Sequence, residues 1–235
     1  MNTLITGCSR GIGLALTHVL LSKWHQVIAT ARQPESCSSL QTLKEEFPET
    51  LYLESLDVTD PESIASCFKR LEDHGIQLDT LINNAAVFAD IPESTIEDLS
   101  AEAFRLTLET NLLGPMQVIQ TFLPLLKGSS NPRVVNISSG AGSISGFMDL
   151  PYYSYGASKA ALNHFTRTLA SDLEPEGICV VAISPGWVRT EMGGDNAELS
   201  PEESATALAN TIDQLSLSDT DSFMGRNGST EGYAW

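Results

Sequence analysis

The feature that most constrains this 235-residue chain is a regular alternation of short apolar runs with longer amphipathic segments. Seven runs predict β-strands: "TLIT", "QVIAT", "LYLESL", "TLINNA", "RVVNIS", "ICVVAIS" and, more weakly, "DSFMG". The segments between them predict helices over residues 11–23, 38–47, 61–75, 100–127, 155–174 and 201–215. Alternating strands and helices form right-handed βαβ units and a parallel sheet. The pattern predicts an α/β fold, one doubly wound domain spanning residues 1–235.

Composition narrows the possible partners. The chain holds 13 basic and 30 acidic residues, a net charge of −17. Nucleic acid and anionic membrane surfaces both need clustered Lys and Arg, so neither is expected as a partner. The acidity favours solubility, and a salt-adapted source is the alternative.

The cysteines, the first residues and the length of the apolar runs bear on metal content and localisation. None of Cys8, Cys37, Cys67 and Cys179 forms a CxxC motif or stands near a His in metal-ligand spacing, so we expect buried or incidental thiols and no metal. The start "MNTLITG" lacks a basic segment before an apolar one, and no apolar run approaches the roughly 18 residues of a membrane span. These features predict a cytoplasmic protein without a membrane segment.

The segment "TGCSRGIG" follows the first predicted strand and opens the first predicted helix. Gly7, Gly11 and Gly13 allow a tight turn and a close approach of a pyrophosphate to the backbone. The helix N-terminus then offers free N–H groups to that anion. The spacing is GxxxGxG rather than the common GxGxxG, but its strand–loop–helix setting predicts a dinucleotide site.

The end of the second strand, "ATARQ", predicts which dinucleotide binds. An acidic residue about 20 positions past the glycines would bind the ribose 2′-hydroxyl of NAD. Ala31 and Arg32 stand there instead. Arg32 can bind a 2′-phosphate, with Arg10 beside it, which favours NADP(H) over NAD. The alternative is that both arginines are solvated surface charges.

Two further strand ends carry candidate cofactor residues. Asp57 in "LDVTD" is placed to bond adenine, and "NNAA" brings Asn83, Asn84, Ala85 and Ala86 to a carboxyl strand end. Ligands of open α/β sheets bind at that edge. The alternative for "NNAA" is an ordinary strand-to-loop turn.

The segment "YSYGASK" contains a candidate catalytic pair. Tyr155 and Lys159 are four residues apart, which places both on one face of a helix. A Tyr hydroxyl has a pKa of about 10. A neighbouring ammonium would lower that pKa, so that the phenol exchanges a proton with a substrate oxygen nearer neutral pH. An exposed surface contact is the alternative.

Two polar segments accompany this pair. "VVNISSG" places Ser138 and Ser139 at a strand's carboxyl end, where a hydroxyl can donate to a carbonyl oxygen, unless the segment is only a serine-rich turn. "TNLLG" inserts Asn111, a poor helix former, into a long predicted helix. Asn111 either bends that helix or holds a water.

Taken together, "TGCSRGIG", "LDVTD", "NNAA", "TNLLG", "NISS", "YGASK" and "PGWVRT" resemble the short-chain dehydrogenase/reductase family, in family order and over nearly the whole chain. The run after "PGWVRT" and the final "YAW" are most similar to its C-factor and Sniffer-type carbonyl reductase branch. The resemblance implies a Rossmann-type domain with a central parallel sheet of about seven strands.

The resemblance also implies roles for individual residues. Tyr155 would be the acid/base, Lys159 its partner, and Asn111 the holder of a proton-relay water. Ser139 matches the catalytic serine, but it precedes Tyr155 by more residues than in many members, so Ser138 and Ser143 stay as alternatives. The implied cofactor-binding residues are Gly7, Ser9, Arg10, Gly11, Ile12, Gly13, Arg32, Asp57, Val58, Asn83, Ala85, Tyr155, Lys159, Pro185, Gly186, Val188 and Thr190.

These observations lead to a functional hypothesis: hydride transfer between NADP(H) and a carbonyl or alcohol compound, as in a carbonyl reductase. Two alternatives stay open, a signalling or scaffold protein on the same fold and an NAD-linked alcohol dehydrogenase. "GFMDLPYY" and "GWVRTEMGG" are expected to line an apolar substrate pocket through Phe147, Met148, Leu150, Tyr152, Trp187 and Met192. The glycines in the second segment suggest a mobile lid. The apolar helices 100–126 and 155–174 predict a homodimer or homotetramer.

Overall fold

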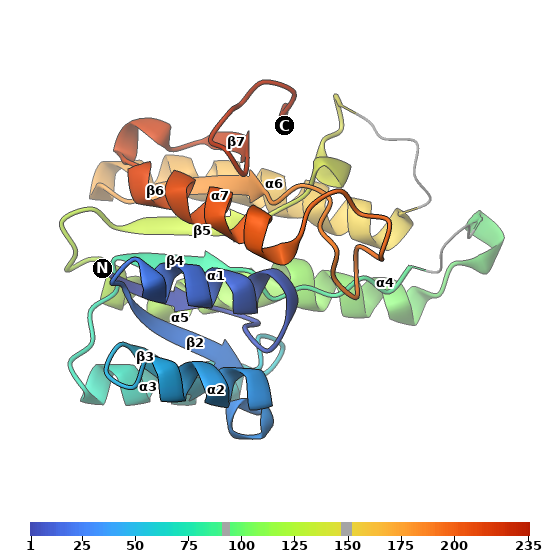
Figure 1. Cartoon of the computed structure of the whole chain (residues 1–235). Coiled ribbons are helices and arrows are strands. Elements are labelled where there is room, and N and C mark those ends of the chain that lie inside the picture. Colours follow the sequence, from blue (N-terminus) through green and yellow to red (C-terminus); the bar gives the residue numbers. More distant parts are fainter. Residues whose placement is uncertain (91–94, 147–151) are drawn as a thin grey trace.

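The computed structural model describes residues 1–90, 95–146 and 152–235. All seven expected strands are present and form one parallel sheet in the order β3-β2-β1-β4-β5-β6-β7 (Figure 1). The strands are β1 (Asn2–Ile5), β2 (Gln26–Ala31), β3 (Leu51–Ser55), β4 (Thr80–Asn83), β5 (Arg133–Ile137), β6 (Cys179–Ser184) and β7 (Ser222–Gly225). The order reverses direction between β1 and β4. The loops after these two strands therefore diverge to opposite sides of the sheet and leave room for a ligand at its carboxyl edge.

Helices cover both faces of the sheet, as expected for a doubly wound fold (Figure 1). One face carries α1 (Gly11–Ser22), α2 (Ser38–Glu46) and α7 (Pro201–Gln214), whose apolar residues share one buried cluster. The other face carries α3 (Pro61–Asp73), α5 (Gly114–Leu126) and α6 (Tyr153–Leu173), which share a second cluster. The expected Asp60 cap is confirmed, because its carboxylate accepts the Glu62 N–H at the start of α3 and Pro61 follows it.

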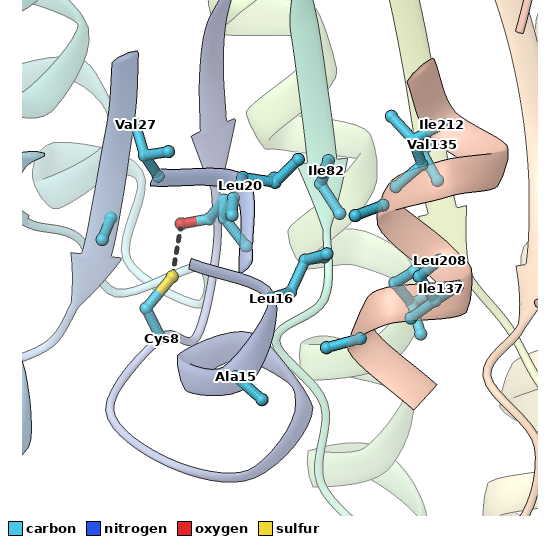
Figure 2. Packing of buried hydrophobic residues seen from close by; sticks show 14 of the residues in the cluster. Cys8, Ala15, Leu16, Leu20, Val27, Ile82, Val135, Ile137, Leu208 and Ile212 are labelled. Carbon is cyan, nitrogen blue, oxygen red and sulfur yellow. Dashed lines mark hydrogen bonds between the residues drawn. The ribbon is translucent and has the colours of Figure 1, made fainter. Parts of the chain in front are cut away.

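The register of the strands explains why each face has its own core. Ile5 lies opposite Ala29 on β2 and Ile82 on β4, and all three point into the first cluster. Successive side chains of a strand point to opposite faces, so the neighbouring Leu4 points into the second cluster. Figure 2 shows the first cluster, in which α1 and α7 contribute Leu16, Leu20, Leu208 and Ile212 over buried strand residues. This two-sided packing holds the carboxyl ends of the strands in fixed positions.

The expected single helix over 100–127 is wrong in one respect. The structure has α4 (Ala101–Leu108), a π-helical turn over Glu109–Leu113, and then α5. The wider turn contains Asn111, whose side chain bonds to residues outside this helix. π-turns inserted in helices are often found at functional sites.

The cysteines, possible metal ligands and helix lengths are also subjects of the sequence-based expectations. Cys8, Cys67 and Cys179 are buried and Cys37 is half-buried, and all four thiols are free. In the described ranges, no group of three His, Cys, Asp or Glu side chains could hold a metal ion. No helix within those same ranges has the length and apolar character needed to cross a bilayer.

Candidate active site

The glycine loop between β1 and α1 is shaped by contacts that exclude side chains. Gly7 and Gly11 have φ of +74° and +58°, a region that residues with a Cβ rarely adopt. A Cβ on Gly7 would lie 2.8 Å from Cα of Ala85, and one on Gly11 would lie 3.2 Å from Cγ2 of Thr190. The loop is therefore enclosed by the "NNAA" segment and by the loop after β6. The expected residues Gly7, Gly11, Ala85 and Thr190 lie together.

Asn84 and Thr6 hold this loop in place. The Asn84 amide nitrogen donates to the carbonyls of Thr6 (2.8 Å) and Gly7 (3.1 Å). The Thr6 hydroxyl accepts the backbone N–H groups of Asn84 and Ala85, both at 3.0 Å. The "NNAA" motif contains Asn84, but the sequence assigns this residue no role of its own. Its partners are about 78 residues away in sequence, so no local pattern indicates them.

The two arginines expected at the 2′-phosphate differ in their surroundings. Arg32 directly follows β2 and is exposed. Within residues 1–90, 95–146 and 152–235, no carboxylate forms an ion pair with it. Arg10 is also exposed, but its Nε lies 2.9 Å from Oε2 of Glu191 in the loop after β6. The structure therefore leaves Arg32 available to an anion, whereas Arg10 already has a partner.

The residues after β3 and at the end of β4 make local or internal bonds. One carboxylate oxygen of Asp57 accepts both the N–H and the hydroxyl of Thr59, which closes a turn. Val58 is buried and packs against Gly114 at the start of α5. Asn83 is buried too, and its Nδ2 donates to Oδ1 of Asn136 at 2.8 Å. The Asn83 side chain thus links β4 to β5 inside the sheet.

The loop after β6 begins with Pro185, whose carbonyl accepts the hydroxyl of Ser204 on α7. A parallel bridge between Val188 and Leu199 closes the segment that follows, and Val188 is buried. Gly186 has a φ of +85°, and a Cβ there would meet the Leu199 side chain at 2.7 Å. The base of this loop is consequently fixed against α7, close to the glycine loop.

Two expected pocket residues lie in the same loop and point outward. Trp187 is 54% exposed and Met192 is 42% exposed. The Trp187 indole N–H donates to the carbonyl of Gly193 at 2.9 Å, and the backbone of Gly193 packs on Val188 too closely for a side chain. These side chains are therefore not part of the core. Phe147, Met148 and Leu150 lie outside the described residues.

Tyr155 and Lys159 are on one face of α6, as their spacing predicts. Nζ of Lys159 lies 5.7 Å from the centroid of the Tyr155 ring. Lys159 is buried and donates to the Ile137 carbonyl at the end of β5, 2.7 Å away. Burial lowers the pKa of Lys159 to about 8. The pair is therefore not an exposed surface contact.

The expected direction of the Tyr155 pKa is wrong. Burial of the phenol raises its pKa to about 12, and a hydrogen bond with Ser139 only partly offsets that increase. The expectation relied on the ammonium of Lys159, but that ammonium is directed to the Ile137 carbonyl rather than to the phenol oxygen. Desolvation of the buried phenol raises its pKa by more than the hydrogen bond with Ser139 lowers it. Residue spacing in the sequence does not reveal this burial.

The three candidate serines have different partners. Ser138 is buried and donates to Oδ1 of Asn163 at 2.6 Å, while Ser143 donates to the carbonyl of Ala234 at 2.6 Å. Ser139 is half-buried and accepts the N–H of Ala141 at 3.1 Å, and its side chain faces the phenol of Tyr155. Its hydroxyl hydrogen can be donated to a ligand oxygen. Of the three, Ser139 is the one whose side chain lies against the Tyr155 phenol, and its catalytic role stays a prediction.

Asn111 connects the π-turn to the segment after β4 and to α6. Its Oδ1 accepts the N–H of Val87 at 2.8 Å, and its Nδ2 donates to the Val87 carbonyl at 2.9 Å and to Ser158 Oγ at 3.1 Å. Ser158 in turn donates to the carbonyl of Tyr155. Both N–H groups of the amide and one acceptor position of Oδ1 thus hold Val87 against α6.

An aromatic group packs on the ring of Tyr155. The Phe88 ring packs on both Tyr152 and Tyr155, with centroids 5.0 Å and 5.2 Å apart. Tyr152 was expected in the pocket, whereas Phe88 was not, although it follows "NNAA" in the sequence. Phe88 contributes an apolar surface next to the phenol.

The final residues of the chain pack on the loop that follows Ser139. The Ser145 hydroxyl donates to the Trp235 carbonyl at 3.1 Å, beside the Ser143 bond to Ala234. The Trp235 ring stacks on Phe223 of β7 at 5.7 Å. The "YAW" segment therefore supports the loop bearing Ser139 from outside.

Comparison with known proteins matches this site to a family. The family model described as short chain dehydrogenase matches residues 1–200, which include the glycine loop, Ser139, Tyr155 and Lys159. The chain belongs to the short-chain dehydrogenase family. Short chain dehydrogenase gsfK of Penicillium aethiopicum is 33% identical over 246 residues, with 96% of each chain covered.

Solved structures of short-chain dehydrogenases agree with the fold. An NADPH-bound carbonyl reductase from chicken fatty liver has a TM-score of 0.92 and 33% identity, covering 100% of this chain and 98% of that one. The carbonyl reductase Sniffer of Drosophila melanogaster has a TM-score of 0.90 and 30% identity, covering 96% of each chain. The resemblance to Sniffer-type carbonyl reductases noted in the sequence is confirmed.

Proposed function

We propose that this short-chain dehydrogenase is an NADPH-dependent carbonyl reductase. The observation that carries the proposal is the arrangement around Tyr155: its phenol faces Ser139, and the buried ammonium of Lys159 lies beneath its ring. All three groups lie at the sheet edge that carries the glycine loop. When bound there, NADPH would supply the hydride for the carbonyl carbon.

The protonation state of Tyr155 suits reduction. With a pKa of about 12, the phenol is protonated at neutral pH and can donate to a substrate oxygen that gains negative charge. The Ser139 hydroxyl is placed to donate to the same oxygen. Alcohol oxidation would need the phenolate, which burial disfavours.

The residues at the sheet edge fit NADP(H). The backbone of the glycine loop packs against Ala85 and Thr190 with no room for a Cβ at Gly7 or Gly11, and the first turn of α1 has no acidic residue to repel a pyrophosphate. Arg32 offers an exposed guanidinium where a carboxylate would select NAD. In this proposal Lys159 binds the nicotinamide ribose with its remaining N–H groups, and Pro185, Gly186 and Val188 lie beside the nicotinamide.

The proposed substrates are apolar or aromatic carbonyl compounds. Phe88 and Tyr152 form an aromatic surface beside Tyr155, and Trp187 and Met192 present further apolar surface on the loop after β6. A pocket with apolar walls and few polar groups suits such compounds.

The decisive experiment is a Tyr155→Phe substitution assayed with NADPH and a panel of activated ketones and quinones. Loss of the general acid should lower kcat on the order of 100- to 10,000-fold, while the ring and its packing are retained. Tyr153→Phe is the matched control, because Tyr153 is a 40% exposed tyrosine on the same helix, and it should keep wild-type activity. An enzyme equally inert in wild-type and Tyr155→Phe forms across a broad panel would refute the proposal.

We also infer that the chain forms a homodimer or homotetramer through the side carrying α4 and α6. These helices pack on each other, and Leu106, Leu113 and Tyr153 remain 51%, 36% and 40% exposed on α4, the π-turn and α6. Burying such apolar side chains against a second copy is favourable. A monomeric mass by light scattering at micromolar protein would refute this inference.

A further inference from the structure

The helix that carries Tyr155 and Lys159 begins without a cap of its own. The first N–H groups of an α-helix have no partner within the helix and usually bond to the side chain of the residue before it. The residue at that position in α6 is Tyr152, which makes no such bond. The N–H groups of Ser154 and Tyr155 therefore need a partner from elsewhere in the chain.

Asp90 supplies that partner from the loop after β4. Its Oδ1 accepts the N–H of Ser154 at 2.9 Å, and its Oδ2 accepts the N–H of Tyr155 at 2.8 Å. Both carboxylate oxygens are thus used on the first turn of α6. Bonds to an ionised acceptor are stronger than neutral ones, and a negative charge at a helix N-terminus is favourable.

Two residues shortly before Asp90 contact the rest of the site. Val87 is bonded at both its N–H and its carbonyl by the side chain of Asn111. Phe88 packs on the Tyr155 ring. The Val87–Asp90 segment thus contacts Tyr155 at the ring through Phe88 and at the backbone through Asp90, and Asn111 sets the position of the segment.

We propose that Asp90 is a positioning residue for Tyr155: by bonding the amide of the catalytic tyrosine itself, it sets where the phenol stands relative to Ser139 and the substrate oxygen. The proposal rests on the role of Tyr155 in the proposed function. Lys159 anchors the same helix to β5 one turn further on, so α6 is held on both sides of Tyr155. Removing Asp90 leaves two helix N–H groups without an acceptor and frees the first turn.

The test compares Asp90→Ala with Asp90→Asn and with the matched control Asp60→Ala. Asn keeps one side-chain oxygen and is among the best residues for capping a helix, but its NH2 group cannot accept the second N–H, so it should restore part of the function. Asp60 caps α3 through the N–H of Glu62, so its loss removes a helix cap from a helix other than the one that carries Tyr155. All three variants are assayed for kcat and KM in carbonyl reduction with NADPH.

We expect Asp90→Ala to lower kcat on the order of 10- to 100-fold, because a displaced catalytic group costs rate rather than cofactor affinity, and KM for NADPH to stay unchanged. Asp90→Asn should recover part of that loss, and Asp60→Ala should keep the wild-type kcat. An unchanged kcat in Asp90→Ala, or an equal loss in Asp60→Ala, would overturn the proposal.

A second measurement does not depend on turnover. Titration of tyrosinate absorbance, taken as the difference between each protein and its Tyr155→Phe form, isolates the Tyr155 phenol. A freed first turn admits water to the phenol, so its titration midpoint should fall in Asp90→Ala and not in Asp60→Ala. If wild type reduces no carbonyl compound, the proposed function fails, but this titration still reports on the surroundings of Tyr155. An unchanged titration midpoint of Tyr155 in Asp90→Ala would overturn the role of Asp90.

Discussion

The group around Tyr155 and the loop from Trp187 to Leu199 lie at the same edge of the sheet but are built in opposite ways. Lys159 and Asn111 are buried, and their polar atoms bond to backbone atoms on other elements. Trp187 and Met192 are exposed, and the indole N–H bonds only within its own loop. Catalytic side chains must be held in a fixed geometry, whereas a surface loop tolerates changes of sequence. The difference suggests that reaction type resides in the first region and substrate choice in the second.

The glycine loop belongs with the rigid region, and the largest expected effect is there. A Cβ on Gly13 would overlap the Gly7 carbonyl oxygen and lie 2.5 Å from Nδ2 of Asn84. Since backbone atoms cannot move aside as a side chain can, we expect Gly13→Ala to cost roughly 3 kcal/mol of unfolding free energy, the upper end for overpacking. It should also abolish measurable NADPH binding, followed by fluorescence and denaturant titration.

Gly75→Ala is the control for that substitution. Gly75 has a positive φ but open space around the position of a Cβ, and it lies between α3 and β4 at the opposite edge of the sheet. It should cost about 1 kcal/mol from backbone strain alone and keep NADPH affinity. If the two variants behave alike, close packing of the loop is not what Gly13 provides.

Arg32 tests whether a single exposed side chain decides the cofactor. Arg32→Asp replaces an attractive charge by a repulsive one at the expected 2′-phosphate. NADPH binding should weaken by about 1.5–3 kcal/mol, roughly 10- to 100-fold, with little change for NADH. Arg10→Ala should have a smaller effect, because Arg10 is paired with Glu191. An unchanged NADPH-to-NADH affinity ratio in Arg32→Asp would remove Arg32 from the cofactor site.

The pKa of Lys159 predicts how the rigid region responds to pH. Burial lowers this pKa from 10.5 to about 8, so the ammonium is present below pH 8 and is lost as the pH rises through it. Since the phenol stays protonated to about pH 12, carbonyl reduction should fall by about tenfold per pH unit above pH 8. The folded state binds fewer protons than the unfolded state between pH 8 and 10.5, so the contribution of Lys159 to stability rises over that range.

A pH profile of kcat for wild type and Lys159→Arg checks this. Arg keeps its charge throughout that range, so its profile should lack the decline near pH 8, at a lower overall rate. A decline that persists at the same pH in Lys159→Arg would assign it to another group.

The sequence predicts well what depends on local periodicity. The seven strands and most of the helices follow from apolar spacing, and the Tyr155–Lys159 pair follows from the helical repeat, since both signals are contained within a few neighbouring residues. The π-turn at Asn111, which divides the expected helix 100–127, does not. The glycine loop can also be predicted, because positive φ and close packing require glycine at Gly7 and Gly11. These local signals place the candidate site at the carboxyl edge of the sheet.

The contacts that could not be predicted join residues far apart in sequence. Asp90 caps α6 across about 65 positions, and Asn111 bonds Val87 across 24. A helix without its own cap gives no sign of which distant carboxylate replaces it. The direction of the Tyr155 pKa shift could not be predicted for a similar reason. Residue spacing indicates a neighbouring charge, whereas burial of the phenol depends on the packing of the whole fold.

The smallest expected effect is that of a substitution in the loop from Trp187 to Leu199, which should change activity toward some substrates and not toward others. Trp187→Ala removes aromatic surface without disturbing the buried group, so kcat/KM should fall about tenfold for bulky aromatic ketones and change little for small ones. Trp187→Phe keeps an aromatic face but loses the bond to the Gly193 carbonyl. If Phe restores bulky substrates, contact area is what Trp187 provides; if it does not, the indole bond orders the loop. A uniform loss across substrate sizes would show that this loop supports the chemistry itself, and the contrast between the two regions would not hold.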